Sequence, residues 1–301
     1  MIAVNEFPAL SIVGPGRVGT AIGVLAARLA WPVVAVGGRD RDKTTQAARR
    51  IGERVRACSM VEAARCGCLV FITVSDDAIE PVCNNIASQN GFNSNSIVVH
   101  CSGALSSDIL SSARDSYQCS IASMHPLQTF PTVDSACARL KGIHCFCEGD
   151  KEGLPVIESL AKHIGMIPVR ICSSSKVLYH AAAVFACNYL VTLMDAAIET
   201  ANLAKIDRST AWSAFAPLVV STIENISEIG PDRALTGPIA RGDIKTIAQH
   251  IEKLELVEPS LASMYRAMAR HAVDIALRNG SITEEKGEEI RSILKCSGQQ
   301  E

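Results

Sequence analysis

The sequence predicts a doubly wound α/β domain over residues 1–172 and an all-helical domain over residues 173–301. A glycine-rich turn lies between an apolar strand and a helix near the start of the chain, and strands and helices then alternate up to about residue 172. From Lys176 to Asn279 the chain consists of long alanine- and leucine-rich stretches with helical periodicity and no convincing strand. Apolar strands that alternate with helices are typical of a parallel sheet covered by helices on both faces.

The expected strands are short apolar runs, many of them rich in β-branched residues. They lie at residues 9–13, 31–36, 69–74, 96–100, 119–124, 143–147 and 166–171. Helices are expected between them at 43–53, 77–86 and 152–164, where apolar residues recur with helical spacing. Because ligands of such sheets bind beyond the carboxyl ends of the strands, the residues that follow each strand are the first candidates for a site.

The first expected strand runs into the turn Gly14-Pro15-Gly16-Arg17-Val18-Gly19, and a helix follows over about 21–29. In this context Gly14 makes the tight turn, Gly16 lets the backbone approach a pyrophosphate, and Gly19 lets the helix pack closely on the strand. The free N–H groups and the dipole of the helix favour the anion. The turn therefore predicts dinucleotide binding, with an ordinary strand-turn-helix as the alternative.

The end of the second strand indicates which dinucleotide is bound. NAD sites usually place a carboxylate at this position, but here Gly38 occupies it and Arg39 and Arg41 follow. A guanidinium can hold a 2′-phosphate through two parallel hydrogen bonds. We therefore predict NADP rather than NAD, with a ribose contact from Asp40 as the alternative.

Two further strand ends carry candidate residues. The backbone of Val74 and Ser75 is expected to pass close to the cofactor ribose, together with Asp76, although Asp76 or Asp77 could instead cap the next helix.

His100 and His125 follow successive strands, each beside small or turn-forming residues, and are expected to converge on one edge of the sheet. We predict a functional role for this pair, with substrate contacts from Ser102 and Gly103, rather than two buried structural histidines.

The helix that opens the second domain carries polar residues on an otherwise apolar background. Lys176 and His180 lie on one face and Asn188 on its flank. Burying such groups without partners is costly, so we predict that Lys176, His180 and Asn188 serve catalysis. In the alternative, Lys176 extends to solvent at the helix start and His180 packs at the domain junction.

A second interruption of the helical pattern follows at residues 234–243. There Arg241 could hold a substrate carboxylate, while Thr236 and the Gly237 backbone supply donors and Asp243 adds a charge. An ion pair between Arg241 and Asp243 that braces the loop is the equally weighted alternative.

Composition restricts the class of protein. With 301 residues, a formal net charge of −2 and 20% charged residues, the chain lacks the basic stripe of a nucleic-acid binder. No apolar run approaches the length of a membrane span, and Met1–Glu6 lacks the features of a signal peptide, so we expect a cytoplasmic protein. The 12 cysteines show no zinc spacing, and we expect free buried thiols rather than a metal or disulfides.

These motifs together resemble the bacterial family described as a Rossmann-like domain joined to domain of unknown function 2520. The matching segments are Gly14–Gly19, His100–Gly103, Met124–Gln128, Lys176 with Tyr179, His180 and Asn188, and Thr236–Pro238 with Arg241–Asp243. More distantly, the layout is similar to 6-phosphogluconate dehydrogenase, pyrroline-5-carboxylate reductase, ketopantoate reductase and prephenate dehydrogenase. The resemblance implies a C-terminal domain like that of 6-phosphogluconate dehydrogenase, a homodimer formed through it, and an active site between the domains. Where those enzymes commonly carry asparagine one turn after the lysine, this chain has His180.

The sequence therefore predicts an NADP-dependent oxidoreductase that transfers a hydride to or from a small, anionic carbonyl, alcohol or imine substrate bound between the domains. In this hypothesis Lys176 is the acid/base or the electrostatic stabiliser, His180 and His125 relay protons or orient the substrate, and Arg241 anchors it. The alternative is an NADP-binding sensor or partner-binding protein that performs no chemistry.

Overall fold

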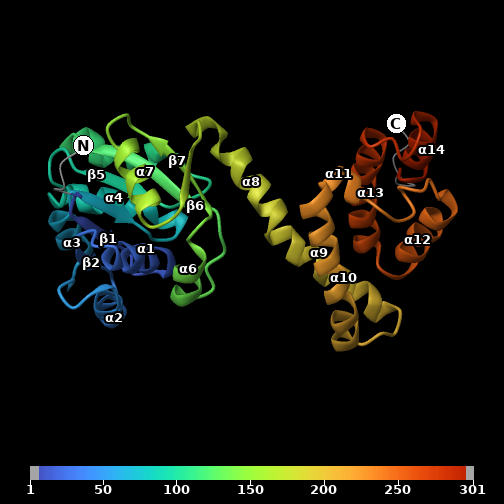
Figure 1. Cartoon of the computed structure of the whole chain (residues 1–301), viewed down its shortest axis with the longest axis horizontal. Helices are drawn as coiled ribbons and strands as arrows, with labels where there is room; N and C mark the ends of the chain where they lie inside the picture. The colour runs from blue at the N-terminus through green and yellow to red at the C-terminus, as the bar shows by residue number, and fades with distance from the viewer. Residues whose placement is uncertain (1–6, 296–301) are drawn as a thin grey trace. The chain divides into compact units, whose positions relative to one another are not determined.

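The computed structural model describes residues 7–295, so the expectation for Met1–Glu6 lies outside the described residues. The chain divides into two compact units, Met1–Ala186 and Cys187–Glu301, here called the sheet unit and the helical unit (Figure 1). The division falls after residue 186 rather than after residue 172. The physical reason is that the helix beginning at Lys176 sends this side chain into the sheet unit, where its ammonium bonds to Ser102 O and Ser123 Oγ.

The sheet unit is built on an eight-stranded sheet in the order β3-β2-β1-β4-β5-β6-β7-β8. The strands are β1 (Leu10–Val13), β2 (Val33–Gly37), β3 (Arg56–Cys58), β4 (Leu69–Ile72), β5 (Ile97–His100), β6 (Ser120–Pro126), β7 (His144–Gly149) and β8 (Ile167–Arg170). The doubly wound sheet is thereby confirmed, but two details differ from the prediction. Strand β3 was not expected, because its three residues include exposed polar ones, and β7 runs antiparallel to β6.

The helices of the sheet unit cover both faces of the sheet. They are α1 (Arg17–Arg28), α2 (Arg41–Ile51), α3 (Met60–Cys66), α4 (Asp76–Ser88), α5 (Ser111–Tyr117), α6 (Val133–Arg139) and α7 (Leu154–His163). The unit also contains α8 (Lys176–Ala186), of which only Lys176 is buried, and the short 3₁₀ turns η1 (Ser107–Leu110) and η2 (Ser173–Ser175). The expected helices correspond to α2, α4 and α7. Helices α3, α5 and α6 were missed because their seven residues are too few to show periodicity.

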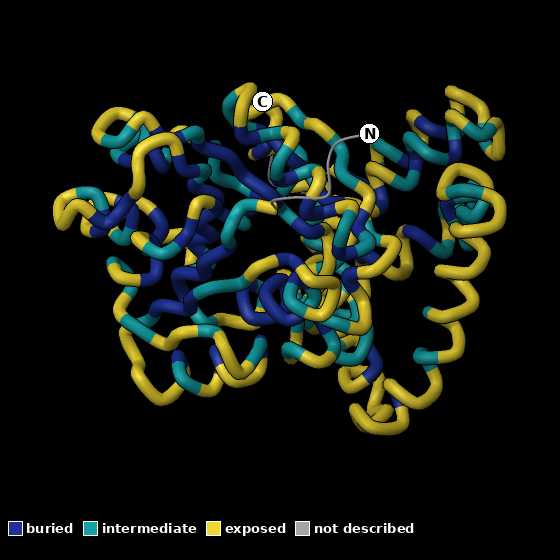
Figure 2. The backbone as a smooth tube through the Cα atoms, turned by 60° about the vertical axis from the view of Figure 1, so that its left-hand side comes forward, coloured by how far each residue is buried: buried dark blue, intermediate teal, exposed yellow. Residues whose placement is uncertain are grey.

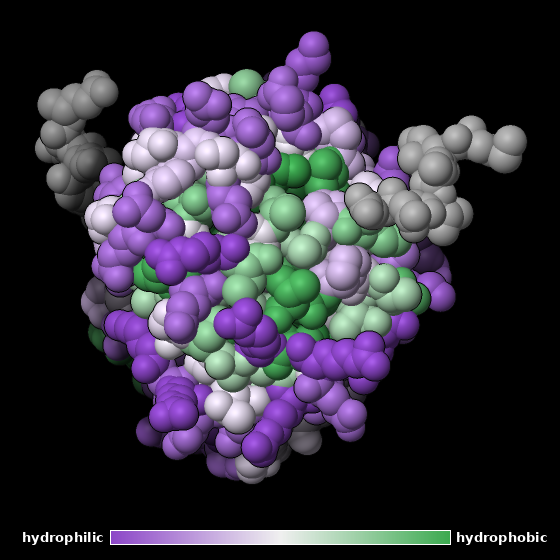
Figure 3. Space-filling model, turned by 90° about the vertical axis from the view of Figure 1, so that its left-hand side faces the viewer, coloured by the Kyte–Doolittle hydropathy of each residue, from purple (hydrophilic) through white to green (hydrophobic). Residues whose placement is uncertain are grey.

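Strand β4 shows how the core is divided between the two faces. Leu69 and Phe71 pack with residues of α1, α6 and α7, whereas Val70 and Ile72 pack with residues of α3, α4 and α5. Successive side chains of a strand point to opposite faces, so an unbroken apolar run requires cover on both sides. Buried backbone accordingly concentrates in the sheet, and the outer face of the unit is largely hydrophilic around a smaller apolar area (Figures 2 and 3).

The helical unit confirms the all-helical prediction for the second part of the chain. Its helices are α9 (Asn188–Leu203), α10 (Arg208–Ile229), α11 (Pro231–Ala234), α12 (Ile244–Val257), α13 (Pro259–Arg278) and α14 (Glu284–Ile293). Its core lies among α12, α13 and α14, where Ile247, Val273 and Ile290 are fully buried. In contrast, α9 and α10 each bury a single residue, Ala201 and Ala211.

One part of the chain differs from the expectation of no membrane-length apolar run. The most apolar 18 consecutive residues of the helical stretch Ser173–Leu203 have a mean hydropathy of 1.6. By length and composition alone, this stretch could cross a membrane. None of these 18 residues is buried. The sequence-based search missed it because polar residues, among them Lys176 and Asn188, divide the run into shorter pieces.

Candidate active site

The glycine-rich turn meets the geometric demands of dinucleotide binding. Gly14 has φ of 100°, where side chains are strained, and a Cβ there would lie 2.8 Å from Val74 Cγ1. A Cβ at Gly19 would lie 2.1 Å from Thr73 Oγ1, whereas a Cβ at Gly16 would meet only the Thr73 carbonyl oxygen at 3.5 Å. Thus Gly14 and Gly19 serve internal packing, and Gly16 faces an open side.

The N-terminus of α1 next to this turn is free to bind an anion. Its N-cap is Gly16, which supplies no side-chain hydrogen bond, and its first turn contains no acidic residue. The N–H groups of a first helical turn need acceptors from outside the helix. Thr73, which the sequence analysis missed, braces the turn by donating a hydrogen bond from Oγ1 to Gly14 O at 2.7 Å.

A cavity of about 760 Å³ lies at the carboxyl ends of β2 and β3. Its lining residues are Gly38, Arg39, Arg41, Thr44, Thr45, Arg56, Ala57, Cys58, Ser59 and Glu62. The predicted pair Arg39 and Arg41 is joined here by Arg56 from the unexpected strand β3. Within residues 7–295 the guanidinium groups of these arginines form no ion pair. Gly38 lets the loop close on the glycine-rich turn, because a Cβ there would lie 2.8 Å from Pro15 Cδ.

The carboxylates around this cavity are engaged in helix caps. Asp40 caps α2, and its Oδ1 accepts hydrogen bonds from the backbone N–H groups of Asp42 and Lys43, both at 3.0 Å. The bond from Lys43 lowers the pKa of Asp40. Glu62 and Ser59 form a reciprocal capping box at the start of α3. The alternative that Asp40 binds the ribose is therefore not supported.

Asp76 was predicted to lie near the cofactor ribose, with a helix cap as the alternative, and it is not the cap. The N-cap of α4 is Ser75, and Asp76 is the first residue of the helix. Its Oδ2 accepts a hydrogen bond of 2.7 Å from Ser102 Oγ. Asp76 therefore connects the end of β4 with the segment that follows β5.

His100 is a structural residue, and its predicted functional role is wrong. The side chain is fully buried, its Nδ1 accepts a hydrogen bond from Ser102 N at 3.1 Å, and its Nε2 lies 3.2 Å from Ser106 O. Burial, followed by the positive charge of Lys176, lowers the pKa of His100 to about 3. A neutral imidazole with both nitrogens bonded to backbone shapes the loop after β5 and has no nitrogen left for a substrate.

His125, His180 and Gly103 lie together in the structure. A Cβ at Gly103 would lie 2.6 Å from His180 Nδ1 and 2.9 Å from His125 Nε2, so both nitrogens face this glycine. The two ring centroids are 6.1 Å apart. His180 Nδ1 is buried and has no hydrogen-bond partner among the described residues. A buried polar atom without a partner is costly, and this one is oriented towards Gly103.

Tyr179 supports this pair from α8. Its hydroxyl and His125 Nδ1 share a hydrogen bond of 2.8 Å. Burial raises the pKa of Tyr179, so the hydroxyl keeps its proton. Burial, with the charge of Lys176 as the second cause, lowers the pKa of His125 to about 4. His125 is therefore neutral at pH 7, and its Nε2 is directed towards Gly103.

Lys176 is buried at 2% exposure rather than exposed to a ligand. Its ammonium donates hydrogen bonds to Ser102 O at 3.0 Å, to Ser123 Oγ, and to Glu148 Oε1 at 3.3 Å. Burial lowers the pKa of Lys176, and Glu148 opposes this shift. The contacts favour the electrostatic role of Lys176 over the proton-transfer role. Glu148 was missed because its position within an apolar strand gives no signal in the sequence.

The remaining candidates belong to the helical unit. Asn188 is the first residue of α9, and its side chain is exposed. Asp243 caps α12, accepting hydrogen bonds from Thr246 N at 3.1 Å and Thr246 Oγ1 at 2.7 Å, which gives it a structural role in place of the predicted substrate contact. Arg241 is exposed and forms no ion pair with Asp243 in this part of the structure, and Gly237 has φ of 93°.

Comparisons with known proteins agree with this architecture. Residues 7–126 match the Rossmann-like domain, and residues 143–272 match the Domain of unknown function (DUF2520). No curated protein shows a significant match to the chain. Protein TM1727 from Thermotoga maritima is 25% identical, with a TM-score of 0.71 over 90% of this chain and 100% of that one.

Two further solved structures share the fold. BF3122 from Bacteroides fragilis, named as a candidate NADP oxidoreductase, is 20% identical, with a TM-score of 0.68 over 88% of this chain and 97% of that one. Pyrroline carboxylate reductase from Plasmodium falciparum, solved with NADP bound, is 14% identical, with a TM-score of 0.55 over 96% of this chain and 98% of that one. The predicted resemblance is confirmed: the chain carries a Rossmann-like domain followed by the domain of unknown function DUF2520.

Proposed function

We propose that the chain is an NADP-dependent oxidoreductase of a small carbonyl, alcohol or imine compound. The observation that carries the proposal is the arrangement of the carboxyl edge of the sheet. An open helix N-terminus and a cavity lined by arginines follow the ends of β1 and β2, where ligands of such sheets bind, and His125 near the end of β6 faces Gly103 after β5 together with His180 of α8. The nicotinamide-dependent reductases among the solved structures with this fold support the same reaction class.

The residues present fit a dinucleotide with a 2′-phosphate. The N-terminus of α1 would hold the pyrophosphate, since its N–H groups face the open side of Gly16. Arg39, Arg41 and Arg56 would surround the 2′-phosphate, and among the described residues Glu62, the one carboxylate that lines the cavity, is engaged in a helix cap.

The proton that accompanies the hydride would be handled by His125. When bound, the nicotinamide supplies or accepts the hydride at the substrate carbon. In the oxidation direction, neutral His125, with its own proton on Nδ1 donated to the Tyr179 oxygen, takes the proton of the alcohol at Nε2 and becomes an imidazolium; in the reduction direction the imidazolium returns that proton from Nε2 to the carbonyl oxygen. Tyr179 holds the ring through Nδ1, and His180 offers a second nitrogen to the substrate.

An anionic group on the substrate would need a cation, and exposed Arg241 remains the predicted anchor. Thr236 and Gly237 remain predicted substrate contacts, and a substrate position between the two domains also stays a prediction.

Replacing Arg39 and Arg56 by alanine is expected to weaken NADPH binding and leave NADH binding unchanged. Each charge-assisted contact with a phosphate contributes about 1.5–3 kcal/mol, so each single variant should raise the Kd for NADPH by roughly 10- to 100-fold. The measurement is a titration followed by nicotinamide fluorescence. Arg49→Ala removes an equivalent exposed charge from α2 outside the cavity and serves as the control.

Equal affinity of the wild type for NADH and NADPH, unaffected by either substitution, would contradict the NADP preference. If neither nucleotide binds, the oxidoreductase proposal fails altogether. Tight NADPH binding with no cofactor oxidation across a panel of keto acids, aldehydes and imines would instead support the non-catalytic sensor.

We also infer that α9 and α10 pack against a second copy of the chain. These two helices expose many more large apolar side chains than a helix that faces water usually does. The exposed residues on and between these helices are Tyr189, Val191, Leu193, Leu203, Ile206, Trp212, Leu218, Val220, Ile223, Ile226 and Ile229. A bilayer is a poorer partner, because Asp195 and Glu199 of α9 form ion pairs with Arg208 of α10 on the same helices.

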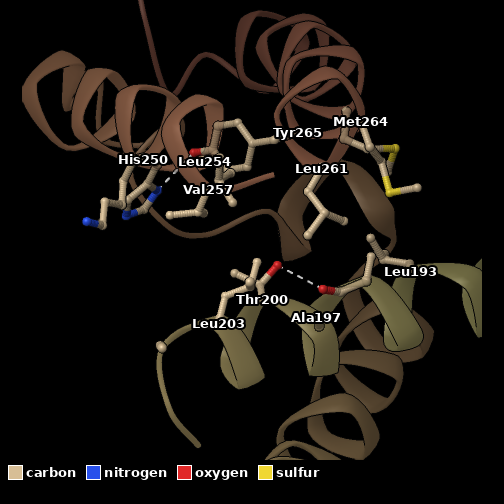
Figure 4. Close-up of a pocket in the computed structure, with 14 residues that line it drawn as sticks. Leu193, Ala197, Thr200, Leu203, His250, Leu254, Val257, Leu261, Met264 and Tyr265 are labelled. Atoms are coloured by element: carbon tan, nitrogen blue, oxygen red, sulfur yellow. Dashed lines mark hydrogen bonds between the residues drawn. The ribbon is translucent and has the colours of Figure 1, made fainter. Parts of the chain in front are cut away.

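A groove of about 450 Å³ lies between α9 and the pair α12–α13 (Figure 4). We infer that an apolar helix of the partner binds in it. Leu193, Leu203, Leu254, Leu261 and Met264 line it, and a hydrogen bond of 3.1 Å between His250 and Tyr265 lies at its wall. Such grooves are suited to amphipathic helices.

The wild-type protein is expected to sediment as a dimer at micromolar concentration. Leu218→Glu, at a position 65% exposed on α10, should raise the dimer dissociation constant by roughly 100-fold, because it buries a charge in the interface. Leu29→Glu places the same charge on an exposed apolar position of the sheet unit and should leave the dimer intact. A monomeric wild type, or one that needs detergent to remain in solution, would contradict this inference.

A further inference from the structure

The sheet unit contains a buried ion pair that the sequence analysis did not predict. Glu148 on β7 is 4% exposed, and Lys176 at the start of α8 is 2% exposed. In the sheet register Glu148 lies opposite Ser123 on β6, so Ser123 and Glu148 both reach the ammonium of Lys176. Removing two charges from water is costly, and a buried pair persists only where its remaining hydrogen bonds are satisfied.

The hydrogen bonds of this pair are complete. The three donors of the Lys176 ammonium are used by Ser102 O, Ser123 Oγ and Glu148 Oε1. Glu148 also accepts hydrogen bonds from the N–H and the hydroxyl of Ser107, each at 2.8 Å. The pair therefore holds Ser102 through its lysine and Ser107 through its glutamate.

The segment between these two serines is the one that carries Gly103. Ser102 Oγ accepts hydrogen bonds from Ala104 N at 3.2 Å and Leu105 N at 3.1 Å, and the Ser106 carbonyl lies 3.2 Å from His100 Nε2. Hydrogen bonds to buried groups thus hold both ends of the segment, at Ser102 and Ser107, and further hydrogen bonds hold its middle. Displacement of either end would move the Gly103 backbone relative to the two histidines that face it.

The same pair affects the charge of the histidine above Gly103. His125 is faced by Tyr179, His180 and Lys176 from α8, by Asp76 from α4 and by His100 from β5. The ammonium of Lys176 opposes protonation of His125, as does His180, whereas Asp76 favours it. Burial lowers the pKa of Lys176, and the neighbouring carboxylate of Glu148 raises it.

We propose that Glu148 is a positioning residue, which acts through Ser107 and Lys176 to fix the Ser102–Ser107 segment and to hold the ammonium of Lys176 at Ser102, next to Gly103. This inference rests on the proposed function, since it gives a purpose to the place of Gly103. Glu148 itself does not contact the substrate position.

The test uses the full chain and a charge-balanced double variant, Glu148→Gln with Lys176→Met. Removing both charges avoids leaving one of them buried and unpaired, so the variant is expected to fold. Amide hydrogen exchange of residues 103–106 should accelerate at least roughly tenfold, because the segment loses its buried supports. The NMR titration of the His125 imidazole should shift upward by about one pH unit, because the ammonium of Lys176, which opposes protonation of His125, is gone.

Glu158→Gln is the matched control, because it removes a carboxylate whose ion-pair partner, Arg170, is exposed. It should change neither readout. Ser107→Ala removes the hydroxyl hydrogen bond between Glu148 and the segment, leaves the one from the backbone N–H, and removes no charge. It should accelerate exchange of residues 103–106 and leave the His125 titration in place.

The two readouts separate this inference from simple structural support. Wild-type exchange and titration in the double variant would overturn it, and so would faster exchange with an unchanged His125 titration. NADPH binding is measured in parallel and tests the proposed function on its own. If the wild type does not bind NADPH, the proposed function is wrong. The hydrogen-exchange and titration results would still test the role of Glu148.

Discussion

A His125→Ala variant is expected to bind NADPH like the wild type and to lose roughly 10²- to 10⁴-fold in kcat, which is the usual contribution of a positioned acid or base. The reason is the placement of His125 Nε2 towards Gly103, together with the hydrogen bond of 2.8 Å between Nδ1 and Tyr179 OH that fixes the ring. The measurement is steady-state kinetics with the first substrate that a panel of keto acids, aldehydes and imines identifies.

The pH dependence adds a sharper test of the same residue. The pKa of His125 is lowered to about 4, below the ordinary 6.5, so the base form persists as pH falls. We therefore expect kcat/KM for alcohol oxidation to decline with an apparent pKa near 4 rather than near 6.5. An imine substrate, which carries its own proton as an iminium, would show a smaller loss on substitution of His125.

His144→Ala supplies the control for this prediction. His144 lies on β7 with its side chain exposed, so its removal should leave kcat unchanged. An unchanged kcat in His125→Ala would reject the proton-transfer role, and His180, with its unpartnered Nδ1, would be the next candidate.

A Lys176→Ala variant is expected to lose about 3–5 kcal/mol of unfolding free energy, which is the usual cost of leaving one member of a buried ion pair alone. Glu148 would keep the hydrogen bonds from Ser107 but would lose its only ion-pair partner within the described chain. Ser102 O and Ser123 Oγ would lose a donor at the same time. Urea unfolding followed by circular dichroism measures the loss.

Two comparisons make the stability prediction specific. Arg170→Ala breaks an ion pair with Glu158 in which the arginine is 63% exposed, and it should cost no more than about 1 kcal/mol. The double variant Lys176→Met with Glu148→Gln should be more stable than Lys176→Ala, since no charge is left unpaired. If Lys176→Ala kept wild-type stability and lost only turnover, Lys176 would be a catalytic residue, as the sequence first indicated.

The sequence was informative wherever local geometry decides the structure. The turn Gly14–Gly19 follows from short-range demands: a left-handed φ at Gly14 and the close contact of Gly19 with the preceding strand end. The alternation of apolar strands and helices likewise required a sheet covered on both faces, because neighbouring side chains of a strand such as β4 need apolar cover on opposite sides.

The sequence was less informative where the same local pattern fits two different roles for one residue. An aspartate after a strand is equally compatible with a ribose contact and with a helix cap, and Asp40 proved to be the cap. A histidine after a strand is equally compatible with a substrate contact and with a buried hydrogen bond. Here His125 faces the position above Gly103, whereas both nitrogens of His100 are bonded to backbone.

By itself, the sequence determined the fold class, the dinucleotide-binding turn and the edge of the sheet where the candidate residues gather. Only the tertiary structure decided that Lys176 is buried, that it meets Glu148, and that Arg56 joins Arg39 at the cavity. The physical reason is that strand and turn formation depend on neighbours along the chain, whereas charge pairing depends on residues brought together by the sheet. Lys176 contacts Ser102 across 74 positions and Glu148 across 28, distances over which no local pattern carries information.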